Sequence, residues 1–168
     1  CDADTPALSD EFDLELRDGR AAALTGADGR EWEVDAVVLA TGGWFGGGLP
    51  GEAPMVEALT GAPLWVDSAP LPGDETLYPP DFLGETPWED HRLFRAGVQI
   101  DRSARLLDRD AEPFENVFAA GRMLAGFNPF HDGCSFGVCL ATGSAAAGEA
   151  ARFANASETI PDATPEPP

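Results

Sequence analysis

Lysine is absent from this sequence of 168 residues, and all 10 of its basic residues are arginines. Its 30 aspartates and glutamates give a formal net charge of −20 at pH 7. Nucleic acids and anionic membrane surfaces attract positively charged proteins, so this balance argues against binding to either. The composition instead indicates a protein of a salt-rich cytoplasm, and hence a halophilic source, because salt screens the repulsion among its negative charges.

Long hydrophobic runs, cysteines and histidines are also scarce. No apolar run approaches the ~20 residues of a membrane-spanning helix, so we expect no direct membrane insertion. Three cysteines, Cys1, Cys134 and Cys139, without a signal-peptide pattern favour a reducing, cytoplasmic setting over a disulfide framework. With only His91 and His131 as histidines, and no zinc or iron–sulfur spacing between the cysteines, we predict no metal site.

The chain divides into an ordered middle and two acidic ends that contain proline. Residues 1–11 and 155–168 show no periodicity, and we predict that both are disordered tails. Residues 12–154 form the predicted folded part. Within it, the proline-rich stretch 68–90 predicts a long loop, which in a compact domain is typical of a lid, a binding loop or a subunit contact.

The first part of the folded region has a β pattern. From Phe12 onward, apolar and polar residues alternate between turn signals at 18–19 and 28–29, which predicts a three-stranded antiparallel meander. The following run, 36–40, is apolar at every position. A strand of this kind is typically covered on both faces, so we expect it inside a sheet.

The second part mixes shorter elements. MVEALTG, residues 55–61, predicts two helical turns, while 98–100 and 116–120 predict strands. A helix of small residues is expected after Gly133. Its residues Gly137, Ala141, Ser144 or Ala145, and Gly148 recur every three to four positions, so we expect this face to pack closely against a flat partner.

Two predicted strands end in the same manner. The strand at 36–40 runs into Thr41, Gly42 and Gly43, and the strand at 116–120 runs into Gly121 and Arg122. Ligands of open α/β sheets bind beyond the carboxyl ends of the strands, where glycine allows close approach to the backbone. Each end is therefore a candidate cofactor edge, or else a strand that simply closes in a turn.

The start of the predicted helix is a further candidate site. Its free N–H groups favour a negative charge outside Cys134 to Gly137, such as the N1–C2=O edge of a reduced flavin, although a ligand-free packed helix has the same pattern. Cys134 is either a reactive thiol or a small buried side chain. His131 is a candidate proton donor or acceptor, or a loop histidine bonded to backbone. Arg122 pairs either with a phosphate or with an acidic neighbour.

A formal G-x-G-x-x-G match at Gly46, Gly48 and Gly51 is weak as a dinucleotide fingerprint. The preceding strand ends several residues too early, Pro50 lies within the match, and the following helix is too short for a crossover. We interpret this stretch as a flexible glycine loop.

Two stretches, DAVVLATGGWFGGGL and LFRAGVQID followed by ENVFAAGRMLAGFNPFHDGCSFGVCLATGSAAA, resemble the carboxy-terminal half of the B-type subunits of anaerobic glycerol-3-phosphate dehydrogenases. These belong to the flavoproteins with two dinucleotide-binding domains, and the resemblance covers about residues 12–153. It implies an α/β protein with a partial FAD/NAD(P)-binding Rossmann-like fold, an antiparallel β-meander and a C-terminal helix of small residues. It also implies a non-covalent FAD or FMN.

The family resemblance implies a role in electron transfer. Such a protein works with a catalytic A subunit and an iron–sulfur C subunit to oxidise glycerol 3-phosphate and pass electrons to membrane quinone. The chain would then lie peripheral to the inner membrane face through a partner. Two alternatives remain: a non-catalytic assembly module of an electron-transfer complex, and a piece of a fumarate-reductase-like flavoprotein.

The resemblance also implies the site. Residues 41–42 would lie near the dinucleotide portion of the cofactor, 121–125 beside its ribityl-phosphate, and 132–137 at the isoalloxazine ring. The predicted cofactor-binding residues are Thr41, Gly42, Gly43, Gly121, Arg122, Met123, Leu124, Asp132, Gly133, Cys134, Ser135, Phe136 and Gly137. The predicted catalytic residues are His131, Arg122 and Ser135. The segment that holds the pyrophosphate in such proteins is not among these residues, so we expect the chain alone to bind flavin weakly or not at all.

Overall fold

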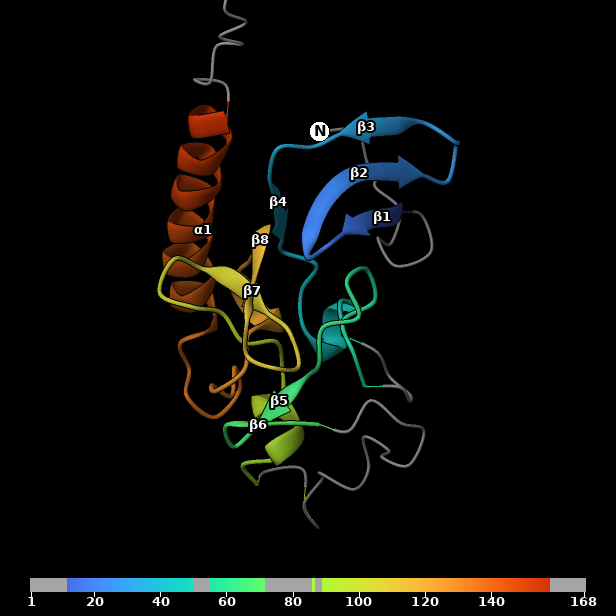
Figure 1. Ribbon diagram of the computed structural model, residues 1–168. Helices are drawn as coiled ribbons and strands as arrows, with labels where there is room; N and C mark the ends of the chain where they lie inside the picture. Colours follow the sequence, from blue (N-terminus) through green and yellow to red (C-terminus); the bar gives the residue numbers. More distant parts are fainter. Residues whose placement is uncertain (1–11, 50–54, 72–85, 87–88, 158–168) are drawn as a thin grey trace, which may run out of the picture.

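The computed structural model describes residues 12–49, 55–71, 86 and 89–157 (Figure 1). The predicted tail 1–11, most of the predicted tail 155–168 and most of the loop at 68–90 lie outside these residues.

The amino-terminal meander is confirmed. Strands β1 (Phe12–Arg17), β2 (Arg20–Gly26) and β3 (Glu31–Glu33) form a three-stranded antiparallel sheet in the order β1-β2-β3. Positive φ angles of 51° at Asp18 and 79° at Gly19 make the tight two-residue turn between β1 and β2. The Asp-Gly signal therefore fixes this hairpin locally.

A second sheet of three strands has the order β4-β8-β7, with β4 (Val37–Leu39) parallel and β7 (Arg105–Leu107) antiparallel to β8 (Pro113–Ala119). The strand predicted at 116–120 is confirmed as the main part of β8. The expectation that 36–40 lies inside a sheet is wrong for the described residues, where β4 ends the strand order and Val38 is 38% exposed. The apolar residues of β4 are explained by its pairing with β8 along one edge and by the burial of one of its two faces, where Leu39 lies.

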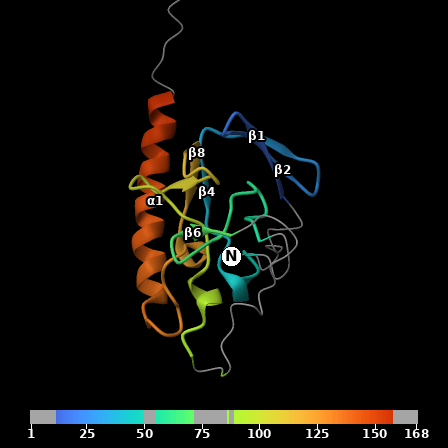
Figure 2. The ribbon, with the colours of Figure 1, turned by 60° about the horizontal axis from the view of Figure 1, so that its bottom comes forward.

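β8 has alternate side chains on opposite faces of the sheet. Val117 and Ala119 join the core cluster that contains Leu14 and Ala21 of the meander. Phe118 and Ala120 pack instead in a second cluster with residues of the helix α1. Figures 1 and 2 accordingly show α1 and the meander on opposite sides of the β4–β8 pair.

The helix α1 (Ser135–Ser157) confirms the helix predicted after Gly133 and includes residues 155–157, which the sequence assigned to a tail. Its packed face was predicted wrongly. Ala146 and Ala150 are buried against the sheet, whereas the residues predicted to pack are exposed. Those residues are Gly137, Ala141, Ser144, Ala145 and Gly148. Small residues occur almost all round this helix, so their spacing does not select one face.

The contacts that select the face come from larger or polar side chains. The Thr142 hydroxyl accepts a hydrogen bond from the Gly121 backbone N–H at 2.9 Å and donates one to the Val138 carbonyl at 2.6 Å. The rings of Phe118 and Phe153 meet edge to face, with centroids 6.4 Å apart. These contacts orient α1 on β8.

Short elements lie between β4 and β7 and directly after β8. These are the 3-10 turns η1 (Trp44–Gly46), η3 (Arg92–Arg95) and η4 (Gly121–Met123), and the hairpin of β5 (Trp65–Val66) and β6 (Ala69–Pro70). The strand predicted at 98–100 is reduced to isolated bridges, from Val98 to Leu124 and from Ile100 to Leu106.

The helical turns predicted at 55–61 are absent, because Glu57 stabilises a turn instead. This residue is only 1% exposed, and its carboxylate accepts hydrogen bonds from the backbone N–H groups of Leu59 and Thr60 at 3.1 and 2.8 Å. The Thr60 hydroxyl donates to the same oxygen at 2.6 Å. This local capping competes with helix formation.

Asn116, on β8, joins the two main sheets. Its fully buried amide accepts a hydrogen bond from Ala21 N at 2.7 Å and donates to the carbonyls of Ala21 and Asp35 at 2.8 and 2.9 Å. A buried amide with these partners fixes the meander relative to β4 and β8.

Candidate functional site

The site begins where β4 and β8 end. Because the strands are parallel and paired from Val37 to Leu39, their carboxyl ends lie at one edge of the sheet. Ala120 N donates to the Leu39 carbonyl at 2.9 Å, which continues the contact beyond β8. The two predicted strand ends therefore meet.

A small cleft of about 70 Å³ opens at this edge. Its lining comes from both strand ends, from η3 and from the loop before α1: Gly42, Gly43, Trp44, Gly46, Phe94, Arg122, Pro129 and Phe130. This volume is below the usual range of small-molecule pockets, about 300–1,000 Å³, so the cleft has room for one end of such a ligand.

The glycines at this edge have two different roles. A Cβ on Gly43 would lie 2.8 Å from the Arg122 carbonyl oxygen, and one on Gly48 would lie 2.4 Å from the Thr41 and Gly42 carbonyl oxygens. Their absent side chains allow backbone segments to pack against one another. A Cβ on Gly46 would meet nothing within 4 Å, so this glycine leaves open space in the cleft. The remainder of the G-x-G-x-x-G match lies outside the described residues.

Aromatic side chains form the walls of the cleft and are held in place. The Trp44 indole N–H donates to the Ala96 carbonyl at 3.2 Å. The Phe94 ring meets the Phe130 ring with centroids 5.2 Å apart and the His91 ring with centroids 5.4 Å apart, both edge to face. Flat, fixed apolar walls of this kind suit an aromatic or short aliphatic ligand.

Arg122 supplies a positive charge to the cleft. Its Nε donates to the Ser135 hydroxyl at 2.6 Å, which brings together two of the three predicted catalytic residues. Seven of the ten arginines form ion pairs with carboxylates: Arg17, Arg20, Arg30, Arg92, Arg95, Arg105 and Arg152. Arg122 has no carboxylate within ion-pair distance in the described parts of the chain, so the acidic neighbour weighed from the sequence is not found there.

The remaining strand-end residues are mostly structural. The Thr41 hydroxyl contacts the Met123 sulfur at 3.7 Å, and the Gly121 N–H bonds to Thr142. Met123 is fully buried and Leu124 is 8% exposed, both in the main core. Met123 and Leu124 therefore pack in the core and do not line the cleft.

The loop before α1 is held by an ionic cluster. Arg95 pairs with Asp90 at 2.7 Å and with Asp132 at 3.2 Å, and Asn128, 1% exposed, donates from its side-chain amide to Asp90 at 2.8 Å. Its side-chain oxygen accepts hydrogen bonds from the backbone of Phe130 and His131. This cluster, Asp90, Arg95, Asn128 and Asp132, fixes the loop that carries Phe130.

The same contacts lower two pKa values. The hydrogen bonds from Arg95 and then Asn128 lower the pKa of Asp90. The backbone N–H of Asn128 is the main cause of a lowered pKa at Asp132, with His131 and Arg95 adding to it. Asp90 in turn raises the pKa of Arg95. Both carboxyls are therefore negative at neutral pH, and Arg95 is matched by two acids.

The tip of α1 and its preceding residues lie beside the cleft and not in its lining. Asp132, Gly133, Cys134, Phe136 and Gly137 are all exposed. Phe136 is 82% exposed, and Cys134 is an exposed free thiol, contrary to its buried alternative.

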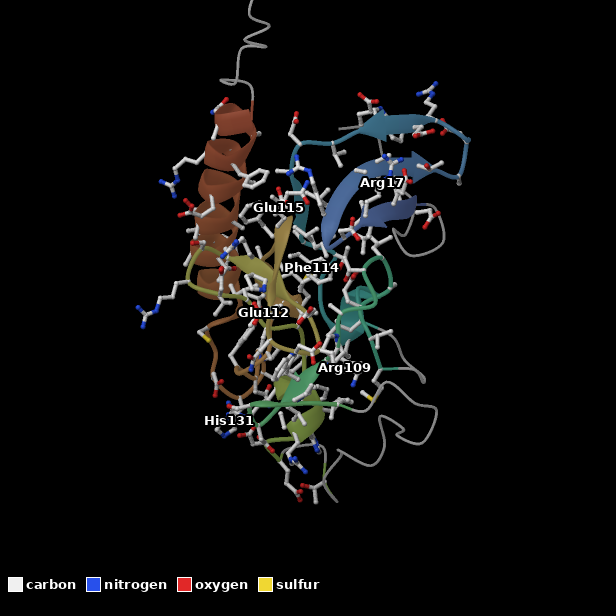
Figure 3. The ribbon with its side chains drawn as sticks, in the orientation of Figure 1. Arg17, Arg109, Glu112, Phe114, Glu115 and His131 are labelled. Atoms are coloured by element: carbon white, nitrogen blue, oxygen red, sulfur yellow. The ribbon has the colours of Figure 1, made fainter. Side chains whose placement is uncertain are left out.

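His131 is also an exposed loop residue. Its Nδ1 lies 3.4 Å from Asp132, and Figure 3 shows it at the opposite end of the molecule from Arg17 of the meander. It does not line the cleft.

The sequence predicted no role for Trp44, Phe94 or Phe130, nor for three members of the ionic cluster, Asp90, Arg95 and Asn128. The Asn-Pro pair at 128–129 is a turn signal that marks Asn128 as a side chain able to bond its own loop. The aromatic residues and Arg95 come from segments far apart in sequence, so no local pattern joins them.

Comparison with protein families agrees with this geometry. Residues 13–138 match the family described as the FAD binding domain. The chain belongs to the FAD binding domain family. Its members are flavoproteins, and the flavoprotein oxidoreductases form the class into which this chain falls.

One curated relative is the B subunit of the anaerobic glycerol-3-phosphate dehydrogenase of Actinobacillus succinogenes, 32% identical over 120 residues. The match covers 70% of this chain and 26% of the relative, so the chain spans about a quarter of that protein's length. No solved structure matches significantly. No helix among the described residues is long and apolar enough to cross a membrane, and within the same residues no cluster of His, Cys, Asp and Glu suits a metal ion.

The residues of the cleft fit part of an FAD molecule. Gly46 leaves space beside Gly42, whose φ of 95° and nearest Cβ neighbour at 3.8 Å keep its backbone accessible. The aromatic walls and one available guanidinium suit a cofactor that combines flat rings with phosphates. The cleft volume of about 70 Å³ has room for only a small portion of it.

Proposed function

We propose that this chain forms one wall of the FAD site in a dehydrogenase that oxidises glycerol 3-phosphate and delivers the electrons, through an iron–sulfur partner, to quinone. The observation that carries the FAD assignment is the meeting of the β4 and β8 ends at a glycine- and aromatic-lined cleft. The relative's name supports the substrate.

FAD, when bound, supplies the redox chemistry, and the chain's residues position it. Gly42 and Gly46 would admit the cofactor, while Trp44 and Phe130 would exclude water from its flank. Arg122, held by Ser135, would offer its terminal N–H groups to a negative group of the cofactor or substrate. His131 and residues 132–137 would border the same opening. FMN in place of FAD would require the same contacts at the flavin end.

Blocking the cleft tests the cofactor assignment. The 168-residue chain is dialysed to equilibrium against excess FAD, and bound flavin is measured by absorbance. We expect weak binding that Gly46→Leu reduces at least tenfold, because a leucine there fills open space without touching the backbone. Gly148→Leu, on the exposed face of α1, is the matched control and should bind as the parent does. Flavin binding by the parent chain that Gly46→Leu leaves unchanged contradicts the assignment.

Reconstitution tests the proposed reaction. Candidate A and C subunits are combined with the chain, and reduction of a quinone analogue is followed on addition of glycerol 3-phosphate. We expect reduction that depends on the chain and falls with Gly46→Leu. A fumarate-reductase-like activity is tested in the same mixture by replacing the substrate with fumarate and a reduced electron donor.

A second candidate function, assembly without catalysis, is favoured by one observation. The exposed face of α1 carries Phe136 and Leu140, which are 82% and 66% exposed, and no charged residue occurs from Ser135 to Gly148. In a chain of net charge −20, a neutral helix face is suited to contact with another protein. Co-elution with the A and C subunits that is lost in Phe136→Ser/Leu140→Ser, with flavin absent, would favour this function.

A further inference from the structure

We propose that the cleft contains an oxyanion subsite, in which Arg122 binds the phosphate or carboxylate of a small organic molecule whose body lies against Trp44 and Phe130. This inference rests on the proposed function for the identity of its ligand, and it adds a substrate class and an anchoring residue to that site.

The Arg122 guanidinium is anchored through one of its three nitrogens. Its Nε is bound to the Ser135 hydroxyl at 2.6 Å, which holds the side chain at the first residue of α1. Its two terminal nitrogens make no ion pair with any described carboxylate. An arginine anchored through Nε keeps its two terminal nitrogens available, and these match the paired oxygens of a carboxylate or phosphate.

Arg122 differs from Arg95 in its ion pairing. Arg95 also lies near the loop before α1, but Asp90 and Asp132 neutralise it from two sides. In a chain with 30 acidic residues and 10 arginines, a carboxylate partner is the common outcome. Arg122, in contrast, has no carboxylate partner among the described residues. It lines a cleft that an external anion can enter.

The cleft that Arg122 lines has apolar walls held in fixed positions. The indole of Trp44 and the ring of Phe94 are fixed by the Ala96 carbonyl and by the neighbouring rings. The ligand's organic portion thus meets apolar walls already in position, and its anionic end meets Arg122. Preorganised groups of this kind lose little entropy on binding.

The net charge of −20 opposes any anion at long range. At an ionic strength of about 0.1 M, charges more than ~10 Å away are largely screened, so the local guanidinium decides the interaction. We therefore expect weak but saturable binding with a defined location.

The experiment uses ¹⁵N-labelled chain titrated at constant ionic strength with inorganic phosphate and, separately, with glycerol 3-phosphate. We expect saturable shifts of the Gly42, Gly43 and Trp44 indole resonances. Arg122→Gln should weaken binding at least tenfold, because a charged hydrogen-bond partner is lost. Arg122→Lys should weaken it less. Arg102→Gln, at an exposed arginine outside the cleft, is the matched control and should leave binding unchanged.

Three results would overturn the subsite: no saturable shift in the cleft, an equal loss in Arg102→Gln, or binding unaffected by Arg122→Gln. Comparison of FMN with riboflavin, which lacks the phosphate, identifies the source of the anion. An Arg122-dependent preference for FMN assigns the subsite to the cofactor, and an Arg122-dependent affinity for glycerol 3-phosphate assigns it to the substrate. FAD binding that Gly46→Leu leaves unchanged, together with Arg122-dependent phosphate binding, would overturn the FAD assignment alone. FAD binding that Gly46→Leu reduces, without saturable phosphate binding, would overturn the subsite alone.

Discussion

At the scale of single residues, the strand-end glycines differ in what they allow. Gly43 has a φ of −103°, which any residue adopts, so its requirement is one of space and not of backbone conformation. The carbonyl oxygen of Arg122 occupies the place of its side chain. Gly46, three residues later, faces open space.

We predict that Gly43→Ala destabilises the fold by about 1–3 kcal/mol, because a Cβ 2.8 Å from the Arg122 carbonyl forces the two strand ends apart. Urea unfolding monitored by circular dichroism measures the change. Gly46→Ala, in the same loop but with no neighbour within 4 Å, serves as control and should leave the midpoint nearly unchanged. Equal midpoints for the two variants would contradict the contact.

The ionic cluster gives a second prediction at this scale. The pKa values of Asp90 and Asp132 are lowered in the folded chain, the first mainly by Arg95 and the second mainly by the Asn128 N–H. Carboxyls with lowered pKa values stabilise the fold above their unfolded-state pKa of about 3.9, and this stabilisation is lost as the pH falls through the folded-state value.

Arg95→Gln should therefore reduce stability most near neutral pH, and the difference from the parent should shrink below about pH 4. Urea midpoints of both proteins at successive pH values give this difference directly. Arg102→Gln, which removes the same charge outside the cluster, should show no such pH dependence. A difference for Arg95→Gln that stays constant down to about pH 2 would rule out the ionic cause.

At the scale of elements, α1 shows that a stripe of small residues does not by itself identify a packed face. Ala146 is fully buried and Ala145, its neighbour, is exposed. The hydrogen bond from Gly121 N–H to the Thr142 hydroxyl and the packing of Phe118 on Phe153 determine which of these two faces packs on the sheet.

We predict that Ala146→Leu destabilises the chain by about 1–3 kcal/mol, since the larger side chain has no room against β8. Ala145→Leu should be nearly neutral, because alanine and leucine have similar helix propensities and the position faces solvent. Thermal unfolding of the two variants compares them. The reverse order would mean that α1 packs on the face that carries Gly137, Ala141 and Gly148.

At the scale of the whole molecule, charge dominates. Thirty acidic residues against ten arginines leave most carboxylates without a cation, and the chain carries a net charge of −20. Mutual repulsion of this size destabilises a compact state, and added salt reduces it.

We predict that the unfolding temperature rises as KCl increases from about 0.05 M to about 0.5 M, a range over which the screening length shortens about threefold. A variant with Asp13→Asn, Glu31→Gln and Glu33→Gln removes three exposed charges of the meander and should show a smaller rise. The same salt dependence in both proteins would point to a cause other than repulsion.

The sequence by itself determined the features that depend on near neighbours along the chain. Asp18-Gly19 and the alternation around it specify the hairpin of β1 and β2, the apolar run before Gly121 specifies β8, and the helix after Gly133 follows from its residue types. The resemblance of two longer stretches, residues 35–49 and 93–147, to a flavoprotein family also indicated a flavoprotein, which the family match confirms.

Only the tertiary structure decided the rest. Glu57 replaces predicted helical turns with a capped turn, β4 lies at the end of its strand order, and α1 turns a different face to the sheet. The cleft unites residues from four separate segments, and the availability of Arg122 depends on which carboxylates lie near it in space. Burial, pairing and charge neutralisation are properties of distances between remote residues, and a local pattern does not contain those distances.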